Sequence, residues 1–187
     1  TGALTKQQKI RRELRRLLTD MGLHEAIGYT FTHPGQKERF PGLYPEAKPI
    51  RLFMPMSEER SVLRTSLIPH LLDAAVYNRN RGTEDVALFE LGTVFVTQEE
   101  TLKDLPEEKT HLAVLLTGKR KGRHWAEKSG SVDFYDLKGI FEQCCEYLGL
   151  YGVEYVPDKP KGFHPARTAA IYLSSGKGKQ RIGWLGQ

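Results

Sequence analysis

The sequence has little cysteine and no long apolar run. Its 187 residues include only two cysteines, Cys144 and Cys145, which are adjacent. Neighbouring side chains of a helix point in different directions, so this pair predicts neither a structural disulfide nor a shared metal site. No apolar run approaches the roughly 18 residues that a membrane span needs, and no secretory hydrophobic segment is present. We therefore expect a soluble protein of the reducing cytoplasm that has no membrane partner.

The motifs of several enzyme classes are also absent. The sequence contains no GxxxxGK[ST] phosphate loop, and the GKGK run at 176–179 lacks the required spacing and the following helix. The six histidines form no HxH, HxxxH or HExxH pattern, which leaves a zinc site without support. No GxSxG elbow marks a nucleophilic serine. Residue types alone therefore assign no catalytic or metal-binding group.

Size and composition set the remaining bounds. With 187 residues, 39% of them hydrophobic, the chain is long enough for one core, and we expect a single domain over residues 1–187. The formal net charge of +5 permits an acidic partner but does not require one.

Hydrophobic periodicity predicts three helices, within residues 5–21, 66–82 and 133–149. Thr5 and Ser66 are the expected N-caps of the first two. The apolar stripe of the first helix includes Ile10, Leu14, Leu17 and Leu18.

Strands are predicted at 24–34, 49–55, 86–96 and 111–118, and again at 153–157, 169–175 and 181–186. Residues 97–110 form the expected long loop of one hairpin, and GKGKQ at 176–180 the turn of another. Helices and strands do not alternate regularly, as they would around a parallel sheet. The predicted class is therefore α+β, an antiparallel sheet flanked by helices.

The densest basic patch is GKRKGRHWAEK, residues 118–128. It surrounds an aromatic ring that could stack on a nucleic-acid base. Basic loops with one aromatic residue are common on ordinary surfaces, so the patch alone assigns no function. The residues that could contact RNA are Arg120, Lys121, Arg123 and Trp125.

The order of several segments carries a resemblance. Residues 4–34, 56–82 (MSEERSVLRTSLIPHLLDAAVYNRNRG), 88–95 (LFELGTVF), 133–142 and 163–186 together resemble the β subunits of bacterial phenylalanyl-tRNA synthetases, specifically their catalytic-like core domain. The resemblance covers essentially the whole chain. One departure is HPAR at 164–167, where Ala166 replaces an expected glycine and puts the turn geometry of that glycine in doubt.

The resemblance implies a class II aminoacyl-tRNA synthetase fold and membership of an (αβ)₂ enzyme that uses ATP and Mg²⁺ to join phenylalanine to tRNA(Phe). It implies that the α subunit is catalytic and that this module is not. The expected partners are the α subunit, the rest of the β subunit and, in the assembled complex, tRNA(Phe). We also expect an excised fragment without the editing and DNA-binding-like modules, whose motif 3 region lies beyond Gln187.

Within LFELGTVFV, residues 88–96, the resemblance locates the strand that carries motif 2 arginines in catalytic subunits, where GRVYR is expected. Thr93 and Val96 replace both arginines here. Neither residue can form a charge-assisted contact with a phosphate. The residues of the expected degenerate pocket are Arg64, Asn78, Glu90, Thr93 and Val96. A buried Glu90 would need a partner, either Arg64 or a backbone N–H.

Residues 5–32 occupy the place of the class II dimerisation element, motif 1. The resemblance therefore implies that its apolar stripe, defined above, supplies subunit contacts or core. Two alternatives remain open. The chain could be a residual ATP or amino-acid binding domain, or an accessory tRNA-binding surface that uses the basic patch.

Overall fold

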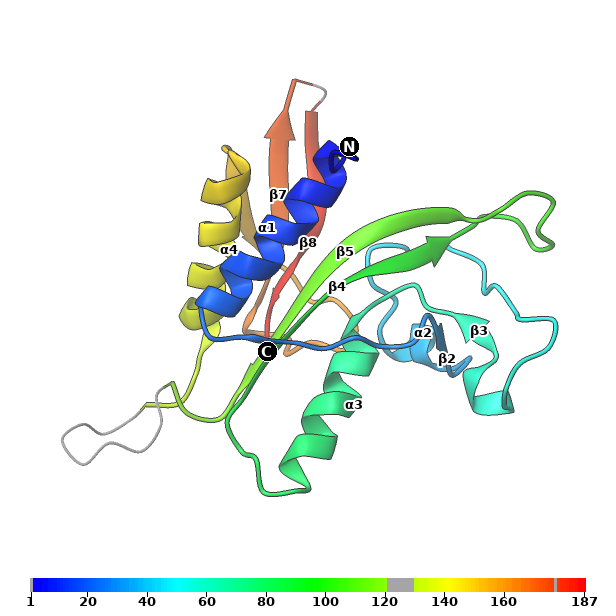
Figure 1. Cartoon of the computed structure of the whole chain (residues 1–187), viewed down its shortest axis with the longest axis horizontal. Coiled ribbons are helices and arrows are strands. Elements are labelled where there is room, and N and C mark those ends of the chain that lie inside the picture. Colours follow the sequence, from blue (N-terminus) through cyan, green and yellow to red (C-terminus); the bar gives the residue numbers. More distant parts are fainter. Residues whose placement is uncertain (1, 121–129, 177) are drawn as a thin grey trace.

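The computed structural model describes residues 2–120, 130–176 and 178–187. Its elements follow one another in the order shown in Figure 1. They are α1 (Lys6–Asp20), β1 (His24–Glu25), β2 (Phe31–Thr32), α2 (Gln36–Arg39), the 3₁₀ turn η1 (Glu58–Arg60), β3 (Val62–Leu63), α3 (Ile68–Arg79), β4 (Val86–Val96), β5 (Glu107–Thr117), α4 (Phe134–Leu148), β6 (Val153–Pro157), β7 (Thr168–Ser175) and β8 (Gly178–Gly186).

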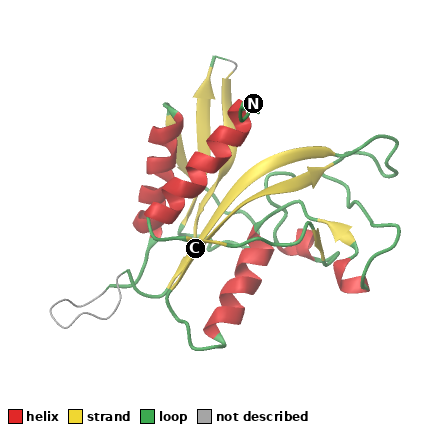
Figure 2. Ribbon diagram, in the orientation of Figure 1, coloured by secondary structure: helices red, strands yellow, loops and turns green. Residues whose placement is uncertain are grey.

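The described strands form three sheets rather than the one that the sequence predicts (Figure 2). The first has the order β1-β4-β5, the second pairs β2 with β3, and the third has the order β6-β7-β8. All pairings are antiparallel except that of β1 with β4, which is parallel. The predicted α+β class is confirmed, whereas the prediction of a single antiparallel sheet was wrong. Long-range pairing of β1 with β4 is not visible in local sequence patterns.

Helices α1 and α4 pack together over one face of the β4–β5 hairpin (Figure 1). The apolar stripe of α1 faces this hairpin, as helical spacing predicts. Leu18 and Phe89 are fully buried in the resulting core. The other buried members are Leu14, Leu23 and Cys144, with Ile10, Leu17 and Ile140 among the partly buried side chains around them.

The predicted helix ends are largely confirmed. The Thr5 hydroxyl accepts from the Gln8 N–H at 3.2 Å, and the Gln8 side chain accepts from the Thr5 N–H at 2.9 Å, which completes a capping box. Asp133 caps α4 in the same way. In α3 the N-cap is Leu67, one residue later than predicted, although the Ser66 hydroxyl still accepts from the Ile68 N–H at 3.3 Å.

Four predicted strands were wrong in extent. Strand β5 begins at Glu107 rather than at 111, so the predicted loop at 97–110 is shorter, and β8 begins at Gly178 rather than at 181. Residues 24–34 form two short strands instead of one, because the chain leaves the edge of β4 after the Ala26 N–H has donated to the Phe89 carbonyl at 2.7 Å. Residues 49–55 form only an isolated bridge, between Arg51 and Val62. The residues between these segments, expected to be irregular, include the short helix α2.

Ala166 lies in a turn that does not need glycine. No non-glycine residue in the described ranges has a positive φ, so this turn is made with ordinary backbone angles. The Ala166 N–H donates to Nδ1 of His164 at 3.1 Å. None of the helices in the described part of the chain has the length and apolarity that crossing a bilayer requires.

Candidate functional site

Strand β4 separates two environments, because successive side chains of a strand point to opposite faces. Phe89 and Leu91 face α1 and α4 in the core. Glu90 and Gly92 face the other way: a Cβ added at Gly92 would lie 3.1 Å from Cδ2 of Leu67, at the start of α3. The candidate site lies on this second face, between β4 and the segment that precedes α3.

Arg64 enters this face from the loop between β3 and α3. Its backbone N–H donates to the Thr30 carbonyl at 2.9 Å, and its carbonyl accepts from the Phe95 N–H at 3.0 Å. Its guanidinium then turns inward, where Nε donates to the Thr93 carbonyl at 2.9 Å and Nη1 to Oε1 of Glu90 at 2.6 Å. The Arg64 and Glu90 side chains are each only 4% exposed. The guanidinium is therefore held by two residues of β4, while the Arg64 backbone is bonded both to β4 and to Thr30.

The two glycines beside this pair allow its close packing. A Cβ at Gly92 would lie 2.5 Å from Nη2 of Arg64, and a Cβ at Gly28 would lie 3.2 Å from Nη1. The Gly28 N–H also donates to Oε1 of Glu90 at 3.3 Å. Both partners predicted for Glu90, an arginine and a backbone N–H, are thus present.

Two buried polar atoms near Gly28 have no hydrogen-bond partner among the described residues, namely Nδ1 of His70 and Oε2 of Glu90. They lie 2.9 Å and 3.2 Å from the same point, the position of a Cβ on Gly28. Burial lowers the pKa of His70, and the charge of Arg64 lowers it further. An uncharged His70 thus faces the carboxylate across the glycine.

The arrangement is suited to structure rather than to binding an anion. A guanidinium that holds a phosphate must present its N–H groups to the ligand. Here the Arg64 side chain is covered, with Nε bonded to the Thr93 carbonyl and Nη1 bonded to Glu90. The space above Gly92, which a ligand would need, is occupied by the guanidinium itself.

The structure brings together only part of the predicted pocket. The guanidinium of Arg64 contacts Glu90 and the main-chain carbonyl of Thr93. The Thr93 side chain, however, points to the opposite face of β4, toward α1 and α4. Val96 shares the face of Glu90 but lies six residues along β4, about 20 Å away. Asn78 donates to the Ala74 carbonyl of its own helix at 2.8 Å. Strand spacing separates Val96 from Glu90, whereas the place of Asn78 in the pocket stays a prediction.

Sequence reasoning missed Gly28 and His70. Gly28 lay inside a predicted strand, where an isolated glycine can indicate a close approach of another group. His70 belongs to no motif, and only the fold places it opposite Glu90. No group of three or more His, Cys, Asp or Glu residues suited to a metal ion occurs in the described ranges.

The remaining predicted residues have other surroundings. The apolar stripe of α1 was expected to supply subunit contacts or core, and contacts within the chain place it in the core. Leu14 and Leu18 are buried, and Ile10 and Leu17 pack against them. Arg120 pairs with Asp136 at 2.7 Å and Asp133 at 3.2 Å, at the start of α4. The rest of the predicted RNA-contacting set, Lys121, Arg123 and Trp125, lies outside the described residues.

Comparison with known structures supports the fold. Two structures of the pyrrolysyl-tRNA synthetase from Desulfitobacterium hafniense are similar, with TM-scores of 0.60 and 0.61 at 17% sequence identity. The similarity covers 93% and 91% of this chain and 54% and 56% of those chains. At this identity it shows a shared mixed fold and nothing finer.

Sequence comparison is more specific. The β subunit of the phenylalanine–tRNA ligase of Shouchella clausii is 47% identical over 187 residues, and that of Bacillus subtilis is 41% identical over 188 residues. Each alignment covers 100% of this chain but only 22% of the relative. The model of the family described as the phenylalanyl tRNA synthetase beta chain CLM domain matches residues 1–187. The chain therefore belongs to the family of phenylalanyl-tRNA synthetase β chain CLM domains.

Proposed function

We propose that this chain is a non-catalytic module with a class II synthetase fold, which supports the α subunit and tetramer assembly in the ATP-dependent charging of tRNA(Phe) with phenylalanine in the cytoplasm. Family membership supports this choice of parent enzyme, because the relatives are β subunits of phenylalanine–tRNA ligases. The chain spans 22% of their length. It would contribute scaffold, whereas the α subunit would contribute the chemistry.

The observation that carries the non-catalytic role is the inward-facing Arg64 guanidinium. Class II adenylation needs an arginine that stabilises charge on the α-phosphate. Both motif 2 arginine positions are replaced, by Thr93 and Val96. Arg64, which contacts this face of the strand, is 4% exposed and pairs with Glu90 at 2.6 Å. A phosphate could reach it only by breaking a buried ion pair, which costs several kcal/mol, about 3–5 by analogy with other buried pairs.

Calorimetric titration of the chain with ATP·Mg²⁺ and with phenylalanine tests this role. We expect no saturable heat from either ligand, alone or combined. A one-to-one binding isotherm would instead favour a residual ATP or amino-acid binding domain. The Glu90→Gln variant distinguishes the non-catalytic module from the residual binding domain. It removes the counter-charge of Arg64 and would strengthen any binding of phosphate beside this guanidinium.

Assembly with the α subunit is tested by co-purification and by a matched pair of variants. Residues 5–32 are our proposed dimerisation element, and Ile27 within it is 88% exposed. Leu105, in the loop between β4 and β5, is 95% exposed. Ile27→Asp should abolish association with the α subunit at micromolar concentrations, whereas Leu105→Asp should leave it unchanged. Association of both variants with unchanged affinity would contradict the proposed element.

A further inference from the structure

A concave feature is present whose lining includes neither Arg64 nor Glu90. It is a groove of about 210 Å³ between the segment that follows α2, the loop between β6 and β7, and strand β8. We call it the aromatic groove. Its lining side chains include three aromatic rings and three prolines, namely Phe40, Phe163, Trp184, Pro41, Pro45 and Pro160.

The aromatic walls are held in place by the chain itself. The indole Nε1 of Trp184 donates to Oδ2 of Asp158 at 2.8 Å, and this bond is the main cause that lowers the pKa of that carboxyl. The rings of Phe163 and Trp184 lie 6.5 Å apart at an angle of 37°. A Cβ on Gly162 would lie 2.5 Å from the Phe40 ring, so this glycine allows the loop to approach it closely. The groove is therefore preorganised to receive a flat ring.

The charge at the rim is positive. Lys161 and Arg181 line the groove, and the guanidinium of Arg181 lies 4.6 Å from the centre of the Trp184 ring. Arg181 is 4.0 Å from Asp158, at the limit of an ion pair, and it retains N–H groups for another acceptor. Asp158, the only acidic lining residue described, is committed to Trp184. Exposed Arg39 and Lys159 adjoin the lining residues in the sequence.

The volume limits what can enter. At about 210 Å³ the groove is smaller than sites for drug-sized ligands, which typically have about 300–1,000 Å³. It suits a single ring system, not an enclosed nucleotide. A ligand that places one ring here must gain further affinity from the cations at the rim. An extended polyanion can do so, because its other negative charges remain outside the groove. Aromatic platforms combined with a cationic rim are the general means of binding single-stranded nucleic acid.

We propose that the aromatic groove binds one base of a single-stranded RNA segment, which stacks on Trp184 and Phe163 while Arg181 and Lys161 contact the flanking phosphates. The positive rim favours RNA over a proline-rich peptide, which would also fit aromatic walls but lacks the repeated negative charge of a phosphate backbone. The choice of RNA rests on the proposed function, in which the parent enzyme charges tRNA. The groove is lined by none of the residues of the basic patch, 118–128.

Tryptophan fluorescence gives a direct test. The chain has two tryptophans, so the Trp125→Phe background leaves Trp184 as the only indole. A hexamer of oligoadenylate should quench its emission saturably, and binding should weaken steeply as salt rises. Phe163→Ala should weaken binding about fivefold or more, which is the lower range for the loss of one stacking partner. AMP, with one phosphate, should bind far more weakly than the hexamer.

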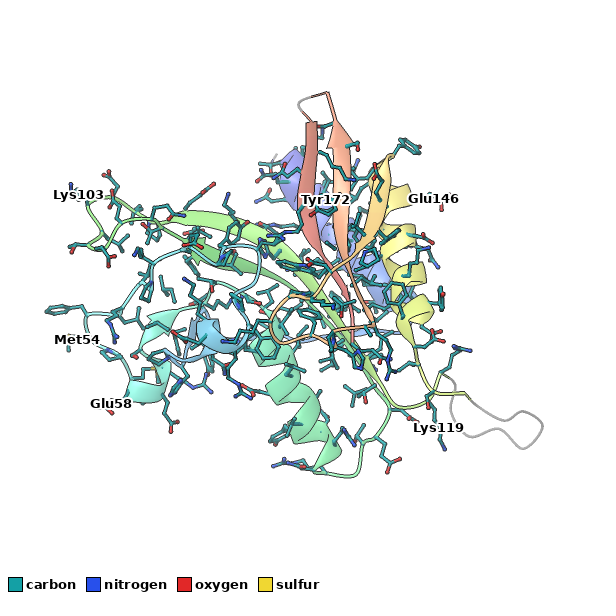
Figure 3. All side chains as sticks on the ribbon, turned by 180° about the vertical axis from the view of Figure 1, so that it is seen from behind. Met54, Glu58, Lys103, Lys119, Glu146 and Tyr172 are labelled. Carbon is teal, nitrogen blue, oxygen red and sulfur yellow. The ribbon has the colours of Figure 1, made fainter. Side chains whose placement is uncertain are left out.

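A charge-reversal pair provides the control. Arg181→Glu removes a rim cation, whereas Lys103→Glu makes the same charge change at the tip of the loop between β4 and β5, which contributes no residue to the groove (Figure 3). Only Arg181→Glu should weaken the binding of the hexamer. The proposal is overturned if the hexamer does not quench Trp184, if both reversals act equally, or if a proline-rich peptide quenches and RNA does not. These outcomes are independent of association with the α subunit, so either proposal can fail alone.

Discussion

Nη1 of Arg64 lies 2.6 Å from Oε1 of Glu90, and both side chains are 4% exposed. The pair joins the loop before α3 to the centre of β4, while the Gly28 N–H adds a third segment. Strand β4 thus carries a buried charged pair on one face, and Oε1 of Glu90 is bonded within the chain. The Arg64 guanidinium occupies the space above Gly92.

Removing one partner of this pair should be costly. In Glu90→Gln the guanidinium of Arg64 stays buried without a counter-charge, and we expect a loss of about 3–5 kcal/mol in the free energy of unfolding. Denaturation by urea, followed by circular dichroism, measures this loss. The double variant Arg64→Met with Glu90→Leu should recover most of it, because two apolar groups replace both charges. A single variant as stable as the parent would show that the pair is open to water.

A methyl group at Gly92 should also destabilise the chain. Its Cβ would lie 2.5 Å from Nη2 of Arg64, and this guanidinium cannot move aside without breaking its bonds to Glu90 and to the Thr93 carbonyl. We expect Gly92→Ala to cost about 1–3 kcal/mol, as overpacking does in other cores. Gly139, within α4, is the matched control, since nothing lies within 4 Å of its Cβ position.

Gly139→Ala should stabilise α4 by about 0.5–1 kcal/mol, because alanine restricts the unfolded chain more than glycine does. Urea denaturation of the two variants side by side gives the comparison. Opposite signs are expected from the same chemical change. Equal effects at both positions would mean that the contact with Arg64 does not govern Gly92.

The sequence predicted those features of the fold that arise from local patterns. The helical spacing of Leu14 and Leu18, the cap at Thr5 and the apolar run of β4 depend on residues close together in the chain, and all three were correct. The parallel pairing of β1 with β4 was not predictable, because it joins His24 to Leu88 through a register that no local pattern encodes.

The site was predictable in chemistry but not in geometry. Burial of a glutamate in an apolar strand requires a partner, and this argument correctly indicated Arg64 for Glu90. The same reasoning placed Val96 nearby, because it did not include strand spacing. His70 remained unnoticed, since only tertiary structure brings it to Gly28.

Stability should fall as pH drops through the histidine range. Burial and the Arg64 charge lower the pKa of His70 below its usual value of 6.5, and Glu90 and Asp73 oppose this only in part. Above about pH 7.5 both the folded and the unfolded states are neutral at this residue, so its contribution to stability is constant there. As the pH falls through 6.5, the unfolded chain binds a proton that folded His70 does not accept, and stability is lost.

His70→Gln should therefore reduce the slope of the free energy of unfolding between about pH 7.5 and 5.5. Burial and Lys109 also lower the pKa of His111, which accounts for a second part of the slope. His111→Gln should reduce the slope independently, and the double variant should reduce it by the sum. Urea titrations at each pH supply the measurement. A slope unchanged by His70→Gln would show that folding does not lower the pKa of this imidazole.

Both cysteines should react slowly with thiol reagents while the chain is folded. Burial raises the pKa of Cys144 to about 11 and also raises that of Cys145. The thiolate is the reactive species, and at pH 8 its population at Cys144 is on the order of a hundredfold below that of a free thiol. Alkylation by iodoacetamide, followed by mass spectrometry, should be slow in buffer and rapid at both positions in urea. Cys145→Ser isolates the Cys144 signal. Rapid labelling of this variant in buffer would show that α4 separates from α1 and β4 often enough to expose the core.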